Sequence, residues 1–352
     1  MTDSKHPARR PYIGTLNHSQ IAANCFEGKS VLITGGTGSF GRQFTQMALA
    51  HGNPKRLAVL SRDEMKQGEM AQHFKHDPRL RFFLGDVRDR DRLHRAFQGV
   101  DIVIHAAALK QVPAAEYNPF EFIKTNVLGA QNVVDAALDA HVGKVVALST
   151  DKAANPINLY GATKLCADKL FVAANSYGGG AGTRFACVRY GNVVGSRGSV
   201  IPFFLNRKAS GVLPITHPDM TRFWITLEQG VSLVLGALNW MHGGEIFVPK
   251  IPSMKVIDLA RAIAPVARRE NVGIRPGEKL HEVMIPGDEA RNTYEYDTHY
   301  VIAPTFPEWG VFDFRSNGGR PVTEGFTYSS DANDHWLTLD ELRGMADEPV
   351  EA

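Results

Sequence analysis

The sequence predicts an α/β fold in which a doubly wound parallel sheet carries a smaller C-terminal region. Short apolar runs alternate with amphipathic segments from residue 31 to about residue 190, a pattern typical of parallel strands joined by helices. A glycine-rich turn follows the first apolar run, where such a fold binds its ligand. The 352 residues, 43% of them hydrophobic, suffice for one large core and a second, smaller unit.

The first apolar run, residues 29–33, indicates a buried strand and leads directly into a turn with three regularly spaced glycines. In a dinucleotide-binding turn of this kind, Gly35 permits the tight bend, Gly38 lets the pyrophosphate approach the backbone, and Gly41 lets the next helix pack closely. The N-terminus of that helix, predicted over residues 40–50, faces the negative charge. We therefore expect a Rossmann-like cofactor site formed by Gly35, Thr37, Gly38, Ser39, Phe40 and Gly41.

The second apolar run, residues 56–60, ends where a dinucleotide-binding fold contacts the ribose of the adenosine half. An NAD-preferring site usually carries an acidic residue there, whereas this chain has Arg62 and, one turn later, Lys66. Basic side chains favour a 2′-phosphate, although the acids at positions 63 and 64 also suit the first turn of a helix. The sequence thus predicts NADP as the cofactor, contacted by Ser61, Arg62 and Lys66.

Two more apolar runs, residues 80–84 and 101–105, complete the first half of the predicted sheet. The first leads into Asp86 and Val87, which we expect beside the adenine ring. The second opens into three alanines from Ala106 onward, whose small side chains leave room for the nicotinamide. A long helical stretch over residues 116–140 then precedes another strand at 142–148.

After residue 190 the alternation loosens into segments divided by proline and glycine, with helical periodicity near 227–241 and 257–267. We expect residues 29–190 to form the NADP-binding domain and residues 191–304 a substrate-binding region that is interleaved with the sheet. Residues 1–28 and 305–352 are polar and rich in turn residues. We expect them to form an N-terminal and a C-terminal extension.

Composition argues against several classes of protein. No stretch reaches the roughly 18 apolar residues of a membrane helix, and residues 1–28 lack the apolar core of a signal peptide. Three widely spaced cysteines, Cys25, Cys166 and Cys187, indicate neither a disulfide framework nor a zinc site. A net charge of +2 without basic blocks gives nucleic-acid binding little support. We expect a cytoplasmic protein without a metal site that binds neither nucleic acid nor membrane.

Residues 150–164 carry the most informative motif, an acid and an amine directly before a Tyr-x-x-x-Lys pair. Tyr160 and Lys164 lie four residues apart and so share one face of a helix. A lysine cation favours the phenolate, which we expect to draw the pKa of Tyr160 from about 10 toward neutrality. The phenol can then take a proton from a sugar hydroxyl, which is the chemistry of a hydride-transfer site.

Asp151 and Lys152 are not needed in a simple dehydrogenase and indicate a second reaction on the oxidised intermediate. A general-acid role needs a protonated Asp151 and a general-base role a neutral Lys152, whereas direct pairing shifts both pKa values the wrong way. We therefore expect no tight salt bridge between them, and we expect Lys110 to lower the pKa of the Lys152 amine by repulsion. The sequence also permits the exchanged roles.

These segments give the chain a close resemblance to the extended short-chain dehydrogenases/reductases, and within them to the inverting UDP-N-acetylglucosamine 4,6-dehydratases of pseudaminic acid biosynthesis. The resemblance runs from about residue 29 to residue 302, and it rests on the glycine turn and on residues 61–66, 105–110, 150–164, 189–199 and 273–279. Retaining dehydratases of the wider family typically carry Asp-Glu where this chain has Asp151-Lys152. That difference predicts inversion at C5 of the sugar.

The resemblance implies a three-step reaction on UDP-N-acetylglucosamine. Tyr160 removes the C4 hydroxyl proton while a hydride passes from C4 to the nicotinamide, with Thr150 hydrogen-bonding the hydroxyl and Lys164 holding the nicotinamide ribose. Lys152 then takes the C5 proton as Asp151 protonates the departing C6 hydroxyl. Hydride return to C6, with delivery of a proton to C5 on the face opposite the original one, regenerates a tightly bound cofactor and gives UDP-2-acetamido-2,6-dideoxy-β-L-arabino-hex-4-ulose.

The same resemblance implies further contacts and partners. The implied substrate contacts are Asn192, Arg222 and Arg275 at the diphosphate, with Lys110 and Lys152 at the sugar. The implied cofactor contacts also include Lys110, Thr125, Asn126, Tyr160, Lys164 and Val193, with the asparagine ordering the backbone near the cofactor. Enzymes of this kind commonly form homo-oligomers, with a hexamer possible, through helices such as those expected at 116–140 and 158–174. Flagellin or a surface glycan is the implied destination of the product.

Two other functions stay open at this point. A UDP-sugar C4 epimerase needs the glycine turn, Tyr160 and Lys164, but it does not need an acid and an amine before them. A catalytically silent NADP-binding regulator or scaffold needs the turn alone, and the intact Thr150, Tyr160 and Lys164 argue against it.

Overall fold

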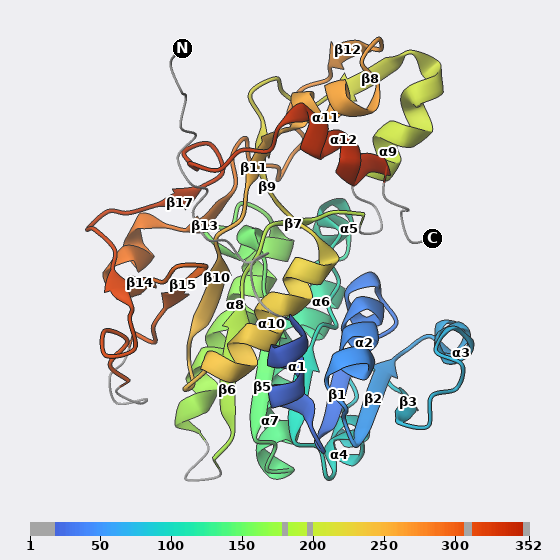
Figure 1. Ribbon diagram of the computed structural model, residues 1–352, viewed down its shortest axis with the longest axis vertical. Helices are drawn as coiled ribbons and strands as arrows, with labels where there is room; N and C mark the ends of the chain where they lie inside the picture. Colours follow the sequence, from blue (N-terminus) through green and yellow to red (C-terminus); the bar gives the residue numbers. More distant parts are fainter. Residues whose placement is uncertain (1–17, 178–181, 196–199, 306–311, 348–352) are drawn as a thin grey trace, which may run out of the picture.

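The computed structural model describes residues 18–177, 182–195, 200–305 and 312–347. A central sheet occupies the lower part of the molecule in Figure 1, and helices cover both of its faces. Its parallel part contains, in spatial order, β3 (Leu80–Leu84), β2 (Arg56–Ser61), β1 (Ser30–Thr34), β4 (Ile102–His105), β5 (Lys144–Leu148), β6 (Arg184–Val188) and β10 (Ile246–Pro249). The strand order 3-2-1-4-5-6 is that of a Rossmann fold, which confirms the predicted fold class.

The strands predicted at 29–33, 56–60, 80–84, 101–105 and 142–148 are all present, with bounds that differ from prediction by at most two residues. Their apolar side chains are mostly buried on both faces of the sheet, as in β1, where Val31, Leu32 and Ile33 are fully buried. The edge strand β3 is the exception, since Leu84 is exposed. A parallel sheet covered by helices on both sides requires such continuous apolar runs. The apolar runs in the sequence therefore predicted these strands reliably.

Helices form a layer on each face of the sheet. One layer contains α1 (His18–Phe26), α2 (Ser39–His51) and α10 (Leu227–Trp240), which contact one another. The other contains α4 (Arg90–Phe97), α7 (Gly129–Asp139) and α8 (Leu159–Ala173), while α3 (Glu64–His73) lies beside β2 and β3 at the sheet edge. The main hydrophobic core lies between the sheet and these layers.

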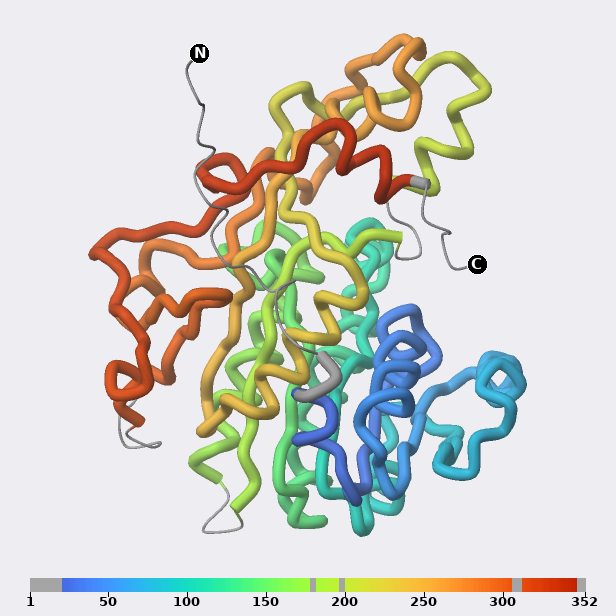
Figure 2. Tube along the Cα trace, viewed as in Figure 1, coloured from blue at the N-terminus to red at the C-terminus, as the bar shows by residue number. Residues whose placement is uncertain are grey.

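The N-terminal extension expected over residues 1–28 needs correction. Residues 1–17 lie outside the described residues, but α1 packs against α2 and α10, and Figure 2 shows it beside the yellow trace of α10. Ala22 and Phe26 are fully buried, and the ring of Phe26 meets that of Phe44 edge to face at a centroid distance of 5.6 Å. The helix belongs to the main core. It was missed because its apolar positions span little more than one turn, which is too short to show a period.

The C-terminal extension expected over residues 305–352 is also part of the fold. Antiparallel strands β15 (His299–Ile302), β14 (Thr293–Glu295) and β16 (Arg320–Pro321) extend the sheet beyond β10, so the region after residue 190 is interleaved with it. β17 (Tyr328–Ser329) pairs with β13 (Val283–Ile285), and α12 (Leu339–Asp347) packs against α11 (Val256–Ile263). Residues 306–311 and 348–352 lie outside the described residues. These elements are too short for a periodic signal, and tertiary contacts define them.

A second, smaller lobe lies above the sheet in Figure 1. It contains a three-stranded sheet of β7 (Asn192–Val193), β9 (Thr221–Ile225) and β11 (Ser253–Lys255), and a parallel pair of β8 (Val212–Ile215) and β12 (Arg268–Asn271). Together with α9 (Val200–Arg207), α11 and α12, these strands enclose a separate core around Leu213, Trp224 and Leu259. Residues 196–199, the end of one motif quoted for the resemblance, lie outside the described residues.

The helix predicted over 116–140 is interrupted. α5 (Val112–Tyr117) ends before Pro119, which begins α6 (Pro119–Phe122), and a π-helical segment η2 (Ile123–Leu128) then leads into α7. Proline has no N–H to donate and is best tolerated in the first turn. Likewise α11 ends at Ile263 rather than near 267, because Pro265 disfavours helical backbone in the residue before it. Short 3₁₀ helices are η3 (Asp151–Ala153), η4 (Ala174–Ser176), η5 (Lys208–Ser210) and η6 (Gly287–Asn292).

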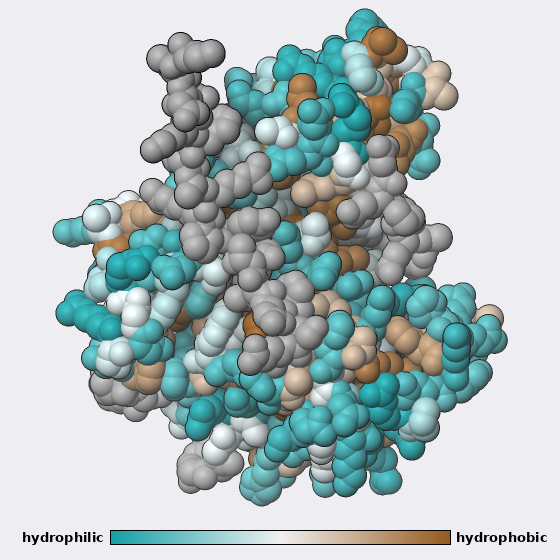
Figure 3. Space-filling model, in the orientation of Figure 1, coloured by the Kyte–Doolittle hydropathy of each residue, from teal (hydrophilic) through white to brown (hydrophobic). Residues whose placement is uncertain are grey.

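The surface in Figure 3 is mostly hydrophilic, and hydrophobic residues appear on this face in small groups rather than as one broad patch. In the part of the chain that the structure describes, no helix combines the length and the apolar character that a membrane crossing requires.

Candidate active site

A cavity of about 1340 Å³ lies at the carboxyl ends of the parallel strands. It is lined by the glycine turn after β1, by the segments that follow β2, β4, β5 and β6, and by Glu278 from the chain beyond the smaller lobe. Ligands of doubly wound folds bind at this edge of the sheet. Every site residue predicted from the sequence lines this cavity except Asn126, Arg222 and Arg275.

The glycine turn has the geometry of a phosphate cradle. Gly35 has a φ of +67°, which residues with a side chain rarely adopt. A Cβ added to Gly41 would lie 2.2 Å from the carbonyl oxygen of Gly36, so a larger residue would push the turn away from α2. The helix begins after Gly38 without a side-chain cap, which leaves its first N–H groups for a ligand. The turn therefore fits the pyrophosphate of a dinucleotide.

Basic and acidic side chains alternate at the end of the cavity where the adenosine ribose is expected. The Arg62 guanidinium lies 3.6 Å from the Asp86 carboxylate, and the Lys66 amine lies 2.9 Å from that of Asp63. Asp86, expected beside the adenine, is also bound by Arg88 at 2.7 Å. Both predicted cations therefore line the cavity, and each has an acidic neighbour.

Asn126 acts on the backbone beside the cavity rather than lining it. Its Oδ1 accepts from the Leu109 N–H at 2.9 Å, and its Nδ2 donates to the Leu109 carbonyl at 2.9 Å and to Thr163 Oγ1 at 3.0 Å. It thereby ties the chain before Lys110 to α8, next to Lys164. The π-helical segment η2 places Asn126 inward and Thr125 at the cavity wall, and such segments are frequent at functional sites.

Tyr160 and Lys164 lie in the first turns of α8 with their side chains buried. Asn158 caps the helix, accepting from the Gly161 N–H at 2.7 Å and donating to the Gly277 carbonyl at 2.8 Å. This contact links the helix start to the segment that carries Glu278. The Lys164 amine donates to the Leu148 carbonyl at the end of β5 at 2.7 Å. Both side chains line the cavity, as the motif predicted.

The expected depression of the Tyr160 pKa is not found. Burial raises the pKa of this phenol to about 12, and the charge of Lys152 and a hydrogen bond to Thr150 oppose the rise only in part. Burial also lowers the pKa of the Lys164 amine. The prediction was wrong because it assumed that both groups are solvated. The helix instead places the phenol and the amine in a poorly solvated wall of the cavity, where burial disfavours the charged form of each.

The expectation that Asp151 and Lys152 stay apart is also wrong. The Lys152 amine lies 3.1 Å from Asp151 Oδ1, which also accepts from the Thr150 hydroxyl at 2.9 Å. The short 3₁₀ helix η3 turns the adjacent side chains to the same side, whereas in an extended chain they would point apart. The second oxygen of Asp151 is buried, and no residue in the described ranges hydrogen-bonds it.

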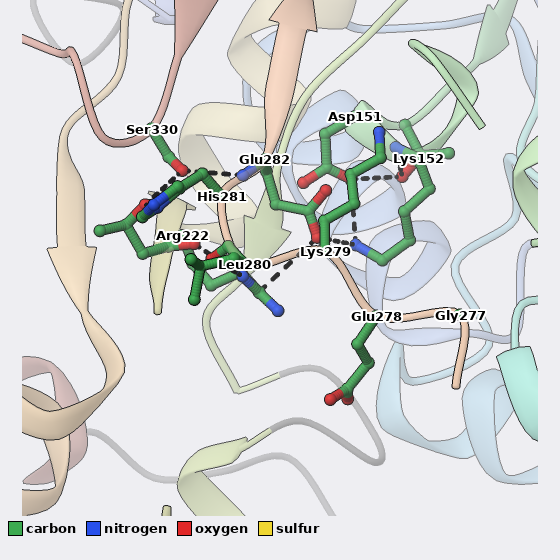
Figure 4. A network of polar contacts seen from close by, with 12 residues as sticks. Asp151, Lys152, Arg222, Gly277, Glu278, Lys279, Leu280, His281, Glu282 and Ser330 are labelled. Carbon is green, nitrogen blue, oxygen red and sulfur yellow. Dashed lines mark hydrogen bonds and ion pairs between the residues drawn. The ribbon is translucent and has the colours of Figure 1, made fainter. Parts of the chain in front are cut away.

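Lys152 carries a second acidic neighbour that the sequence analysis did not identify. Glu282 Oε1 lies 3.4 Å from the Lys152 amine. Figure 4 shows the two side chains in the same network of polar contacts. Burial lowers the pKa of this amine, but the carboxylates of Asp151 and Glu282 outweigh that effect and raise it. The predicted fall in the pKa of the Lys152 amine is therefore not found, whereas burial and the Lys152 charge lower the pKa of the Lys110 amine.

Of the three groups expected at the substrate diphosphate, only one lines the cavity. Asn192 does, and its Oδ1 is buried without a hydrogen-bond partner among the described residues. Arg222 is buried beneath the cavity wall, where its guanidinium donates to the carbonyls of Thr221 at 2.7 Å and Leu280 at 3.1 Å. The Arg275 side chain is 59% exposed and lies 3.9 Å from Glu278. The structure therefore places Asn192 at the cavity but neither arginine, and near Arg275 it is Glu278 that lines the wall.

The segment around residues 277–282 holds side chains at or beside the cavity that were not predicted from the sequence. Glu278 lines the cavity, the Lys279 amine donates to the Ala154 carbonyl at 2.5 Å, and Glu282 reaches Lys152. Glu278 and Lys279 fall within the motif 273–279 already quoted for the resemblance, and Glu282 follows three residues after it. The sequence analysis instead named Arg275, because a cation suits a diphosphate.

A dinucleotide cradle, a Tyr-x-x-x-Lys pair and an acid–amine pair in one cavity define an extended short-chain dehydrogenase/reductase with additional acid–base groups. The chain belongs to the family described as polysaccharide biosynthesis protein, whose model matches residues 31–304.

Comparisons with individual proteins agree with the predicted resemblance. The chain is 55% identical over 324 residues to UDP-N-acetylglucosamine 4,6-dehydratase (inverting) of Campylobacter jejuni, which covers 90% of this chain and 97% of that protein. It superposes on the X-ray structure of Pen from Bacillus thuringiensis with a TM-score of 0.83 at 37% identity, over 91% of this chain and 97% of the other. DesIV, a dTDP-glucose 4,6-dehydratase from Streptomyces venezuelae crystallised with NAD, gives a TM-score of 0.63 at 26% identity, covering 71% and 86%.

Proposed function

We propose that this protein is an inverting UDP-N-acetylglucosamine 4,6-dehydratase that forms UDP-2-acetamido-2,6-dideoxy-β-L-arabino-hex-4-ulose. One observation carries the proposal: Tyr160, Asp151 and Lys152 line the same cavity, so oxidation and loss of water can occur on one bound sugar. The similarity to the Campylobacter jejuni enzyme supports the choice of substrate. An epimerase would have no use for the acid and the amine.

The residues present fit a nicotinamide dinucleotide, with the glycine cradle for the pyrophosphate and the small side chains of Ala106 to Ala108 at the far end. A bound oxidised nicotinamide supplies the hydride acceptor, and its positive ring charge favours the phenolate form of a neighbouring tyrosine. Tyr160 takes the proton of the C4 hydroxyl, and Thr150 holds that hydroxyl in place. Lys164 is placed to hold the nicotinamide ribose.

The ion pair of Asp151 and Lys152 supplies the states that elimination requires. Transfer of one proton from the Lys152 amine to Asp151, across the 3.1 Å contact, converts the ion pair into a neutral amine and a neutral carboxylic acid. A site closed to water favours this neutral pair, since it penalises charge. Lys152 then takes the C5 proton, which the 4-ketone makes acidic, while Asp151 protonates the departing C6 hydroxyl. Both residues end the step with their original charges.

We further propose NADP as the cofactor, because Arg62 and Lys66 both line the cavity at the adenosine end. Replacing Arg62 with alanine should weaken NADP binding about tenfold and leave NAD binding nearly unchanged, since a charge-assisted hydrogen bond contributes roughly 1.5 kcal/mol. Titration calorimetry with each dinucleotide measures the difference. Arg261→Ala, which breaks the remote pair with Asp258, is the matched control. Equal weakening of both cofactors, or tighter binding of NAD by the unaltered protein, would count against NADP.

The wider setting is likewise a proposal. We place the reaction at the first step of a pseudaminic acid-type pathway in the cytoplasm, with flagellin or a surface glycan as the final acceptor. A homo-oligomer is supported by large exposed hydrophobic side chains on and beside the helices offered for self-association, namely Tyr117, Phe120, Leu128 and Ile157.

Incubation with UDP-N-acetylglucosamine in deuterated water tests the proposed function. We expect a product that has lost one water, carries one deuterium at C5 and has inverted C5 stereochemistry, as mass spectrometry and proton NMR would show. A C4 epimer without loss of water would identify an epimerase instead. Tight cofactor binding without any turnover would point to the silent regulator.

A further inference from the structure

Glu282 is a buried carboxylate that the proposed reaction does not yet use. Its side chain is 2% exposed and does not line the cavity. Oε1 lies 3.4 Å from the Lys152 amine and 3.6 Å from Arg222 Nε, while no hydrogen bond reaches Oε2 from any described residue. Figure 4 shows Glu282 between Arg222 and Lys152. The carboxylate therefore stands directly behind the amine that faces the sugar.

The backbone of Glu282 is held in place by the C-terminal part of the chain. Its N–H donates to Ser330 Oγ at 2.9 Å, and the Ser330 N–H donates to its carbonyl at 2.8 Å. Ser330 Oγ also lies 2.7 Å from the Thr221 hydroxyl on β9. Three segments distant in sequence thus meet at this residue. Such support leaves the side chain little freedom to move away from Lys152.

The contacts of Glu282 are not those of a residue whose role is only to stabilise the fold. A buried carboxylate is stabilising only when its oxygens are well paired, yet one oxygen of Glu282 has no partner in the described chain and the other has contacts longer than 3.3 Å. Charges of alternating sign run from Arg222 through Glu282 and Lys152 to Asp151. A buried polar group without a partner calls for an explanation, and a catalytic role is a common one.

We infer that Glu282 is a positioning residue that holds the Lys152 amine toward the sugar. The inference rests on the proposed dehydratase function. The negative charge of Glu282 opposes the transfer of the Lys152 proton to Asp151 and favours the ammonium that forms again when Lys152 takes the C5 proton. Over the whole step, its contribution to the rate is therefore the fixed position of the amine. Glu282 itself gains and loses no proton. The electrons of the C5–H bond form the C5–C6 double bond as the C6 hydroxyl leaves with the proton of Asp151.

The charged and titratable groups that face Lys152 determine how the pKa of its amine changes when Glu282 is replaced. Asp151 and Glu282 raise its pKa, whereas burial and Arg222 lower it. Three further groups feel its charge, namely Lys110, Lys279 and Tyr160. Removing the charge of Glu282 leaves the cations in the majority, so the pKa of the amine must fall.

The test replaces Glu282 with glutamine in the full-length protein and follows two readouts. The first is the rate at which an amine-acylating reagent modifies Lys152 as a function of pH, measured by peptide mass spectrometry without substrate. We expect the titration to move to lower pH by about one unit or more. The second is steady-state turnover. We expect kcat to fall at least tenfold with KM unchanged, because Glu282 does not line the cavity and its loss removes the contact that holds the amine in place.

Glu295→Gln is the matched control, since it removes the carboxylate 2.6 Å from the Lys250 amine far from the cavity, and both readouts should stay unchanged. Glu282→Asp keeps the charge and should restore part of the amine titration and part of kcat. If the glutamine variant does not fold, the aspartate variant provides the test. An unmoved amine titration and an unchanged kcat in a folded variant would overturn the inference. If the titration of Lys152 moves in the Glu282→Gln variant but the unaltered protein does not dehydrate the substrate, the result contradicts the proposed function instead.

Discussion

Replacing Lys152 with alanine is expected to stop the loss of water while oxidation at C4 continues. The amine lines the cavity and contacts Asp151 at 3.1 Å, so its removal takes away the base and leaves the acid without its proton source. General acid–base catalysis contributes roughly 10²–10⁴-fold, and we expect a loss at the upper end because both groups are affected. Tyr160 and Lys164 remain in place, and loss of the Lys152 charge raises the pKa of Tyr160, so oxidation at C4 should be slower but not abolished. Reduced nicotinamide should therefore accumulate in absorbance while no dehydrated product forms.

The variant also leaves two buried carboxylates without their shared cation, which can cost roughly 3–5 kcal/mol of stability. Thermal unfolding of each variant must therefore accompany the kinetics. Lys255→Ala removes an exposed lysine from β11 and should behave like the unaltered protein in both measurements. Unchanged dehydration by a folded Lys152→Ala protein would rule out this residue as the base.

Replacing Tyr160 with phenylalanine should abolish the first step and with it every later one. The phenol is 8% exposed and lines the cavity, and its removal takes away the acceptor of the C4 hydroxyl proton. We expect turnover to fall by about 10³-fold or more, without transient cofactor reduction. The two variants therefore divide the reaction, since Lys152→Ala should retain the absorbance change that Tyr160→Phe loses.

The pH dependence of the unaltered protein follows from the same tyrosine. Burial raises the pKa of the phenol to about 12, so the phenolate is scarce near neutral pH and its fraction grows as pH rises. The rate of C4 oxidation should accordingly increase from neutral to alkaline pH, and the Tyr160→Phe variant should lack this increase. Tyr177→Phe, at an exposed position, serves as control. A rate of oxidation in Tyr160→Phe close to that of the unaltered protein would exclude the assigned role.

Much of the fold could be predicted because its signals are local. The apolar runs of the parallel strands and the glycines of the cofactor turn each act within a few residues, and the structure contains them within two residues of the predicted bounds. Short elements were less predictable. Helix α1 and the pieces after residue 305 have too few residues to show a period, and they take their conformation from partners such as Phe44 and β13.

The residues of the site were predicted better than their pKa values. Tyr160, Lys164, Asp151 and Lys152 all line one cavity, as the motif implied. Their pKa values were misjudged, because a pKa depends on burial and on neighbours that the local sequence does not reveal. Arg275 was predicted for its charge, yet its side chain is 59% exposed and does not line the cavity, which Glu278 reaches.

The sequence by itself determined the dinucleotide turn, the parallel strands and the identity of the reacting side chains, because these depend on spacing within one strand, one turn or one helix. Only the tertiary structure decided which charges meet. Glu282 and Lys152 are remote in the chain, and they approach to 3.4 Å because β13 is anchored by Ser330 and the strand pairing behind it. The pKa values of the groups in the cavity depend on these contacts, since an opposite charge acts over only a few ångströms.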